Sequence, residues 1–456
     1  MSERVKIITI GSGVFFSIMS TSMLAIAAPD LVQHLGVGYS VLQWRFELFF
    51  TIFALCLPLW GQVADRIGPR KQFLLGLGLF AAGSAGSALV HHWALFLGFQ
   101  TLQAIADSML VPAIMSLIRR TFPEERMGWA FGWFGATLTA ASLCGPGVGG
   151  LVLQYLPLSA LFWILFAGSA ATLLVAARVL PSLAPTRPGA PLPLMGTGLL
   201  LTAALALQVG ISPTSGVRLR LVAFAVALLA GAAFGMGELR GVTPRIFPAG
   251  MWGNAQFVGA CVRMFLLFLS TNILSLMGPT YLREVHRISP GVVGAMLVVA
   301  EAWSMVLLTR TGALADRNGM RSVAMGIAIS ILGMIVFAWT PPPAMFWMLS
   351  IGLLVSAVGG SLSSPALDRL AATATPLDES GAYMGVFQMF QHSSGAFAAV
   401  LLGLFSAGAE GGVSLEGYRK GTVVAVLASL GALVSVGLDF VRTRSRAKRL
   451  CEQEGV

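Results

Sequence analysis

Residues 61–71 of the chain read GQVADRIGPRK, and residues 312–321 read GALADRNGMR. Both copies fit the pattern GxxADRxGxR. The shared positions are Gly61, Asp65, Arg66, Gly68 and Arg70 in the first copy and Gly312, Asp316, Arg317, Gly319 and Arg321 in the second. A charged turn that only fixes the topology of the chain accounts for one copy. Two copies at one spacing favour a duplicated helical bundle in which the loop has a role of its own.

The residue types in this loop have clear physical uses. The first Gly of each copy lets a helix end pack closely against a neighbour. The second Gly can adopt the positive φ that a tight turn into the next helix requires. The Asp can cap a helix start or pair with Arg.

Composition restricts the class of protein around these loops. The chain has 456 residues, of which 56% are hydrophobic and 11% charged, whereas soluble domains carry about 25% charged residues. A soluble protein with so few charges would expose large apolar patches. The composition therefore excludes a soluble enzyme, a nucleic-acid-binding module and a disordered chain, and it predicts a polytopic protein of the lipid bilayer.

Stretches of about 20 apolar residues are long enough to cross a bilayer as helices. We predict fourteen such spans, near 7–28, 44–64, 71–90, 94–117, 128–153, 158–179, 194–211, 217–237, 254–281, 290–308, 322–340, 344–366, 381–406 and 420–441. The first stretch also resembles a signal peptide, because Arg4 and Lys6 precede it. Its length and the spans that follow favour a retained first helix.

Basic residues divide unevenly between the two sides that fourteen spans define. Both copies of the repeated loop, both termini and most Lys and Arg residues fall on one side, which the positive-inside rule makes cytoplasmic. The net charge of +10 therefore does not indicate a nucleic-acid partner. We expect an inner (plasma) membrane protein whose termini are both cytoplasmic.

The Pro-rich segment Pro181–Leu194 separates the first six spans from the rest of the chain. The predicted organisation is a six-helix bundle at 1–180, a linker with two inserted helices at 181–250, a second six-helix bundle at 251–441, and a basic cytoplasmic tail at 442–456.

The doubled loop resembles the cytoplasmic loop motif of the major facilitator superfamily. A second resemblance lies in 128–153, where a GPxxGG sequence follows an earlier Gly and is similar to the motif of the superfamily's drug:proton antiporters. The matching residues are Gly132, Gly145, Pro146, Gly149 and Gly150. Small residues on one helix face allow close approach to a neighbour, and the Pro weakens the helix backbone.

The resemblance implies an all-α major facilitator fold of two six-helix bundles plus two additional helices, as in the fourteen-helix drug:proton antiporters. It implies proton-coupled efflux of small amphipathic compounds, including multidrug resistance, by a monomer that uses no cofactor, no metal and no nucleic acid. Two positions differ from the family pattern. Ser20 stands where the first helix often carries Asp, and Gln100 stands where the fourth helix usually carries Arg.

Ionisable groups inside membrane spans are candidates for function because their burial is costly. The proton-coupling candidates are Asp107, Glu301 and Glu47, in that order, and a structural ion pair is the alternative for each. Glu301 lies eleven residues before Gly312, about 16 Å along a helix and so near mid-bilayer.

Other polar residues in the spans are candidates for lining a cavity, or alternatively for hydrogen bonding between helices. Gln100 and Gln103 share a helix face with Asp107 through i, i+7 and i, i+4 spacing. The remaining candidates are Arg263, Gln388, Gln391 and His392. For Arg263 a structural pair with a carboxylate is the other interpretation.

The sequence contains none of the enzyme motifs HExxH, GxxxxGK[ST] or GxSxG. A transporter is therefore expected rather than an enzyme. Within transport, a specific metabolite exporter, importer or facilitator stays open as an alternative. Outside transport, the alternative is a membrane sensor or assembly partner.

Overall fold

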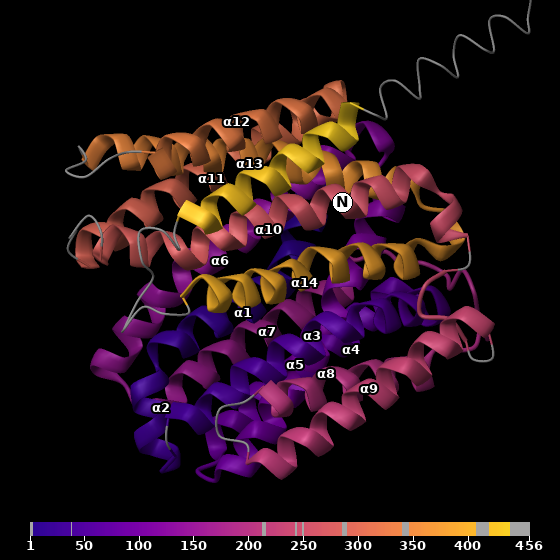
Figure 1. The fold of residues 1–456 in the computed structure, drawn as a ribbon. Helices are drawn as coiled ribbons and strands as arrows, with labels where there is room; N and C mark the ends of the chain where they lie inside the picture. The colour runs from indigo at the N-terminus through magenta and orange to yellow at the C-terminus, as the bar shows by residue number, and fades with distance from the viewer. Residues whose placement is uncertain are drawn as a thin grey trace, which may run out of the picture. The chain divides into compact units, whose positions relative to one another are not determined.

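The structure is a computed structural model of the chain. It describes residues 3–37, 39–211, 216–241, 244–248, 250–284, 290–339, 346–406 and 419–437. Within these ranges the regular elements are all helices, in agreement with the all-α prediction (Figure 1).

The first nine α-helices are α1 (Glu3–Ile26), α2 (Ala28–Leu35), α3 (Tyr39–Ile67), α4 (Pro69–Leu89), α5 (Trp93–Thr121), α6 (Met127–Tyr155), α7 (Ser159–Val179), α8 (Leu194–Ile211) and α9 (Val217–Arg240). They are followed by α10 (Ala255–Glu284), α11 (Pro290–Asn318), α12 (Met320–Trp339), α13 (Phe346–Ala374), α14 (Ser380–Ser406) and a helical segment over Arg419–Gly437. Short 3₁₀ turns lie at Glu124–Arg126, Met251–Gly253 and Leu377–Glu379.

Each of the fourteen predicted stretches coincides with one of these helices, and α2 is an additional short helix. Eleven helices among the described residues are long and apolar enough to cross a membrane. The apolar parts of α8 and α11 are shorter, at Leu194–Gly210 and Val298–Leu308. The chain is thus a multi-pass membrane protein, and the count of fourteen spans stays a prediction.

Local sequence explains several helix boundaries. Pro69 occupies the first turn of α4, where a missing N–H costs nothing. Gly68 and Gly319 have φ angles of 94° and 46°, so both turns of the repeated motif adopt the predicted positive φ. Proline also lies inside α3, α5, α6 and α13, which membrane helices tolerate better than soluble ones.

The chain divides into two compact units. Unit 1 contains Met1–Pro123, Ala140–Asn254 and Thr375–Met389, and unit 2 contains Glu124–Thr139, Ala255–Ala374 and Phe390–Val456. Unit 1 therefore includes α8, α9 and the beginning of α14. The predicted division at residues 180, 250 and 441 stays a prediction, and the predicted basic tail lies outside the described residues.

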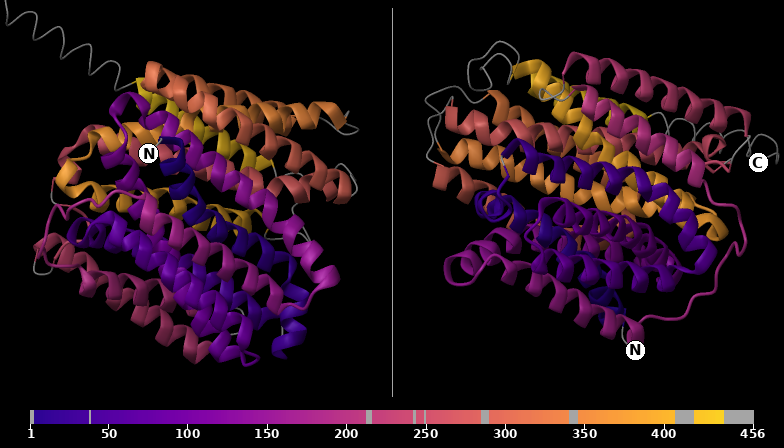
Figure 2. Two further views of the ribbon diagram at one scale, coloured as in Figure 1. Left: turned by 180° about the vertical axis from the view of Figure 1, so that it is seen from behind. Right: turned by 90° about the horizontal axis from the view of Figure 1, so that it is seen from below.

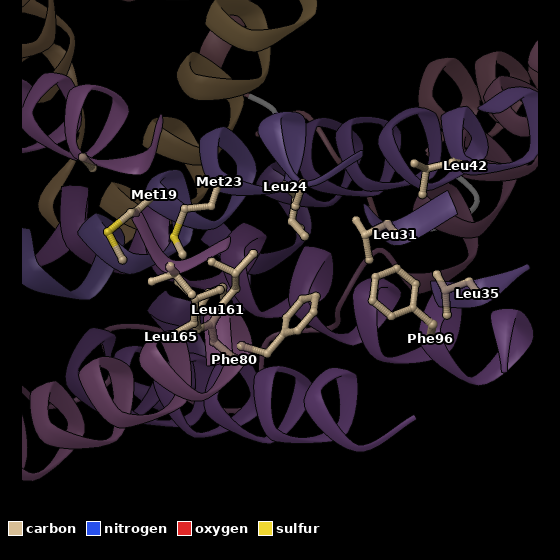
Figure 3. Packing of buried hydrophobic residues seen from close by; sticks show 14 of the residues in the cluster. Met19, Met23, Leu24, Leu31, Leu35, Leu42, Phe80, Phe96, Leu161 and Leu165 are labelled. Carbon is tan, nitrogen blue, oxygen red and sulfur yellow. The ribbon is translucent and has the colours of Figure 1, made fainter. Parts of the chain in front are cut away.

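Within unit 1, α4 packs against α5 and α7, α3 packs against α5, and α1 packs against α7. Figure 3 shows the apolar side chains that fill the space between these helices. Met23 and Leu24 of α1 are buried together with Phe80 of α4, Phe96 of α5 and Leu161 of α7. In a bilayer such interdigitation holds helices together through van der Waals contact, because lipid tails are equally apolar.

The α8–α9 pair is attached to α3 in the same unit. The Gln208 side-chain amide donates to Thr51 Oγ1 at 2.5 Å. Gln62 Nε2 donates to the carbonyls of Arg245 and Ile246 at 2.8 and 3.0 Å, in the segment after α9. The inserted region is therefore held to α3 at Thr51, near the middle of that helix, and at Gln62, near its C-terminal end.

Within unit 2, α10, α11 and α12 all pack against α13; Figure 2 shows the helices from two further sides. Small residues bring α12 and α13 close together. A Cβ on Gly333 would lie 2.7 Å from the Gly352 carbonyl oxygen, and one on Gly326 would lie 2.6 Å from that of Gly359. The buried side chains of Met334 and Phe337 continue this interface into the core of the unit.

Candidate functional site

A buried polar face lies along α5. Asp107 is fourteen residues from each end of this helix, a distance of about 21 Å each way. Asp107 is 1% exposed, and the side chains of Gln100 and Gln103 are fully buried. The three residues thus share one inward face, as their spacing predicted.

Hydrogen bonds connect this face to the two neighbouring helices. Arg45 Nε on α3 donates to Gln100 Oε1 at 2.8 Å, and Gln100 Nε2 donates to Ser87 Oγ on α4 at 2.9 Å. Gln103 Nε2 donates to Ser84 Oγ of α4 at 2.8 Å. A buried polar network therefore joins α3, α5 and α4.

The Asp107 carboxyl faces α1 as well. The Ser17 hydroxyl is its polar neighbour there, although neither carboxyl oxygen completes a hydrogen bond of good geometry. The charge of Arg45 acts on the same carboxyl. The other two proton-coupling candidates lie on other helices. Glu47 is half-buried on α3, and Glu301 belongs to α11 with a side chain that lies outside the described residues.

Arg45 of α3 is a residue that the sequence analysis did not include among the site candidates. It is 1% exposed, and its guanidinium carbon lies 4.8 Å from the ring centroids of both Phe46 and Phe49. One signal could have found it. Arg45, Phe49, Ile52 and Cys56 recur at i, i+4, i+7 and i+11, and all four are buried, so this face of the helix points inward.

The first copy of the repeated loop forms a helix cap. Asp65, at the end of α3, is 2% exposed. Its carboxylate accepts the backbone N–H groups of Gly381 at 2.8 Å and Ala382 at 2.9 Å, at the start of α14. The carboxylate therefore satisfies N–H groups that a helix start leaves unpaired, and it faces the positive end of the helix dipole.

Two glycines make this capping contact possible. A Cβ on Gly61 would overlap the carbonyl of Gly381, and a Cβ on Gly385 would lie 2.5 Å from the Leu57 carbonyl oxygen. The predicted close packing of the first Gly of the motif is thus present. Arg66 is half-buried, and the Arg70 guanidinium donates to the Ala177 carbonyl at the end of α7.

The linker after α7 crosses this cap, and we call its residues 183–187 the linker strap. The backbone N–H groups of Thr186 and Arg187 donate to the Asp65 carbonyl at 2.9 and 3.0 Å. Thr186 Oγ1 donates to the Asp378 carbonyl at 2.7 Å. The Arg187 guanidinium pairs with the carboxylates of Asp378 and Glu379.

Two further contacts fix the strap. Arg120 Nη2 donates to the Ala184 carbonyl at 2.8 Å, and a Cβ on Gly68 would lie 2.8 Å from the Leu183 carbonyl oxygen. The strap therefore touches the motif loop, α5 and the segment before α14. Sequence analysis identified this segment only as a linker.

The second copy of the loop forms the turn between α11 and α12, where Gly319 has its positive φ and Arg321 is exposed. Gly312, Asp316 and Arg317 belong to α11, but their surroundings lie outside the described residues. The predicted roles of these three residues stay predictions.

The helix with the GPxxGG sequence, α6, uses two of its glycines to approach α1. A Cβ on Gly145 would lie 2.5 Å from Ser22 Cβ and 3.0 Å from the Met19 carbonyl oxygen, and one on Gly149 would lie 3.4 Å from Met23 Cα. Pro146 and Gly150 are exposed, and Gly132 is buried. Gly145 and Gly149 therefore form the contact face that the motif predicted.

The remaining polar candidates are distributed over both units. In unit 2, Arg263 is 1% exposed, and it donates to the hydroxyl and the carbonyl of Ser435 at 3.2 and 3.1 Å. Gln388 in unit 1 is buried, whereas in unit 2 Gln391 is half-buried and His392 is exposed. Asp368 on α13 is a further buried carboxyl, which the sequence analysis did not single out.

Comparison with known proteins identifies the family. The family model described as Major Facilitator Superfamily matches residues 10–399. The chain belongs to this superfamily. Its members are transporters of small molecules rather than enzymes, which agrees with the helical fold and the doubled loop.

Several curated relatives are resistance proteins. The chain is 26% identical to the tetracenomycin C resistance and export protein of Streptomyces glaucescens, over 94% of this chain and 83% of that protein. It is 27% identical to the methylenomycin A resistance protein of Bacillus subtilis, over 79% of this chain and 78% of the relative. It is also 27% identical to the methyl viologen resistance protein SmvA of Salmonella typhimurium, over 94% of this chain and 88% of that protein.

Solved structures share the fold at lower identity. The human organic anion transporter MFSD10 superposes with a TM-score of 0.68 at 16% identity, covering 96% of this chain and all of that one. The proton:xylose symporter XylE superposes with a TM-score of 0.64 at 13% identity, covering 93% of this chain and 94% of that one. The major facilitator fold expected from the doubled loop is thus supported by structure as well as by sequence.

Proposed function

We propose that this protein exports small amphipathic compounds, drugs among them, in exchange for protons. In this proposal it works as a monomer of fourteen spans in a bacterial inner membrane, with both termini in the cytoplasm, as in the drug:proton antiporter branch. Alternating access needs no covalent chemistry, because proton and substrate only bias two conformations through different affinities for them.

One observation carries this proposal: a carboxyl, that of Asp107, is buried at the midpoint of α5 beside other polar groups. An ionisable group at that depth is costly unless it is paired or hydrated, so its presence is evidence of use. A group that is buried in one state and reaches water in another can bind a proton on one side and release it on the other.

The relatives support export as the direction of transport. Three proteins at 26 or 27% identity are named for resistance, and one of them also for export. The GPxxGG helix against α1 and the Asp65 cap at the start of α14 are the parts that we assign to the conformational change.

Transport into inverted membrane vesicles tests the proposal. A pH gradient, acidic inside, should drive uptake of some members of a panel of amphipathic antibiotics and dyes. Asp107→Asn should abolish that uptake but preserve exchange of labelled for unlabelled substrate, which needs no net proton movement. Glu301→Gln and Glu47→Gln should have smaller effects. If all three variants respond to the pH gradient as the wild type does, none of these carboxyls is the individual carrier.

A second candidate, a transporter for one metabolite, has its own support. Ser20 occupies the usual acidic position of the first helix, and the chain is 22% identical to the riboflavin transporter RibZ of Clostridioides difficile over 82% of its length. Uptake of a single compound from a metabolite panel, with no dependence on the pH gradient, would favour this candidate. A chain that moves no solute would instead be a membrane sensor or assembly partner.

A further inference from the structure

Arg45 is a fully buried cation with unused hydrogen-bonding capacity. Its Nε donates to Gln100 Oε1, but in the part of the chain that the structure describes Nη1 and Nη2 have no hydrogen-bond partner. An Arg in this condition needs an anion nearby, because an uncompensated buried charge destabilises a protein strongly. The rings of Phe46 and Phe49 contribute attraction to the cation but no negative charge.

Three helices pack against α5 and could supply the anion. The titratable side chains of these helices are Glu3, Arg4 and Lys6 on α1, Tyr39, Arg45, Glu47, Cys56, Asp65 and Arg66 on α3, and Arg70 and Lys71 on α4. Those on α1 and α4 lie in the first turns, and Asp65 is bound to α14. Helix α3 itself also packs against α2, α8 and the turn at Leu377–Glu379. Asp30 and His34 of α2 are exposed, α8 has no titratable side chain, and Asp378 and Glu379 pair with Arg187. Glu47 is half-buried, two residues from Arg45, and so points to a different side of α3.

The buried carboxyl that remains is Asp107 on α5 itself. It lies on the helix face that Arg45 contacts through Gln100, two turns further along. Its oxygens have unused hydrogen-bonding capacity as well. The chain therefore has a buried cation and a buried carboxyl in one unit, each lacking the partner that the other could provide.

We propose that Arg45 is the cationic partner of Asp107: from α3 it supplies the positive charge that α5 lacks at Gln100, and it stabilises and orients the ionised carboxylate. Arg45 is thus a positioning residue. Gln100 holds the guanidinium, which leaves its planar Nη1–Nη2 edge available to a carboxylate. The inference deepens the proposed function, in which Asp107 carries the proton, and it adds a residue to that site.

The direct test follows the protonation of Asp107 in purified protein, without transport. The infrared absorption of a protonated carboxyl is titrated with pH, and the Asp107 contribution is identified by its loss in Asp107→Asn. Removing the neighbouring positive charge makes the ionised carboxylate less stable, so Arg45→Gln should move the midpoint upward by at least about one pH unit. An unchanged midpoint in folded Arg45→Gln protein would overturn the proposal.

Three further variants separate charge from structure. Arg45→Lys keeps the charge and should hold the midpoint near that of the wild type. The double variant Arg45→Gln with Gln100→Arg moves the cation onto α5 and should restore the midpoint. Arg218→Gln removes an exposed cation at the start of α9 and should have no effect. If Arg45→Gln does not fold, the double variant alone tests the proposal. An Asp107 titration midpoint in that variant that is shifted from the wild-type value would contradict the proposal.

Transport measurements provide a second test of the proposal. Arg45→Gln should move the pH optimum of proton-driven uptake in the same direction as the infrared midpoint and lower kcat more than it changes KM, and the double variant should reverse both effects. If the wild type shows no proton-driven uptake, the proposed function fails, while the infrared titration still decides whether Arg45 and Asp107 are partners.

Discussion

Asp65 acts on the start of α14, where its partner Gly381 lies 316 residues later in the chain. It satisfies two backbone N–H groups of α14 through a carboxylate that is itself buried, which combines capping with attraction to the helix dipole. A charged turn that only fixed the topology of the chain would need a charge at the membrane surface but no hydrogen bonds to another helix. The geometry instead gives the acidic residue of the motif a specific bonding partner.

Replacing Asp65 with Asn should weaken this cap. Asn retains one acceptor oxygen but loses the charge and the second acceptor. The free energy of unfolding in detergent should therefore fall by about 1 kcal/mol. Transport should fall by a larger factor than substrate binding if, as in the proposed mechanism, the cap forms in only one of two alternating conformations. Thermal unfolding and vesicle uptake measure the two effects. Glu125→Gln, at an exposed carboxyl in the turn before α6, is the control, and wild-type uptake by Asp65→Asn would contradict the role.

The sequence made some of these residues predictable and not others. The inward face of α5 followed from the spacing of Gln100, Gln103 and Asp107, because helix geometry alone brings them together. Arg45 was missed because its partner is on another helix. Periodicity shows that a face is buried, but which neighbour covers it depends on packing between segments 55 residues apart.

At the scale of the element, α6 offers a test of close helix approach. Gly145→Ala places a methyl group 2.5 Å from Ser22 Cβ on α1, and such overpacking costs about 1–3 kcal/mol. We expect lower thermal stability and slower transport. Gly147→Ala is the matched control on the same helix, since nothing lies within 4 Å of its Cβ position. Equal effects of the two substitutions would show that helix propensity, rather than the contact with α1, determines the outcome.

The linker strap should act chiefly through its backbone. The Arg187 side chain is 49% exposed, and surface ion pairs contribute about 0–1 kcal/mol. Arg187→Ala should therefore lower stability by less than about 1 kcal/mol and leave transport close to wild type. Chemical denaturation at low and high salt checks this, because a small loss should disappear as salt screens the pair. A large, salt-independent loss would mean that the side chain holds the strap.

The contacts of the strap could not be predicted from the sequence. Its Pro-rich composition indicates a connecting segment correctly. Its hydrogen bonds to Asp65 and Asp378 join residues more than 120 and 190 positions apart. Those to Asp65 join backbone groups on both sides, and the one to Asp378 joins the Thr186 hydroxyl to a backbone carbonyl. No residue type marks such contacts in advance.

At the scale of the whole molecule, the number of membrane crossings can be measured. Topology reporters inserted after residues 189, 214 and 243 should report cytoplasmic, external and cytoplasmic positions if α8 and α9 both cross the bilayer. A reporter after His91 should be external in any arrangement and serves as the control. Three cytoplasmic readings at 189, 214 and 243 would reduce the chain to twelve spans, with α8 and α9 lying against α3 without crossing.

The cap between Asp65 and α14 also has a consequence for biosynthesis. A ribosome adds about 5–20 residues per second, so residues 381 and 382 follow Asp65 after roughly 15–60 s at those rates. During that interval α3 is already in the membrane, but the Asp65 side chain at its end is exposed to water, because the segment that it caps has not been translated. Unit 1 therefore cannot be completed until most of the chain has been made. Chains that stop before residue 380 should be recognised as unfinished by proteases that act on the cytoplasmic side.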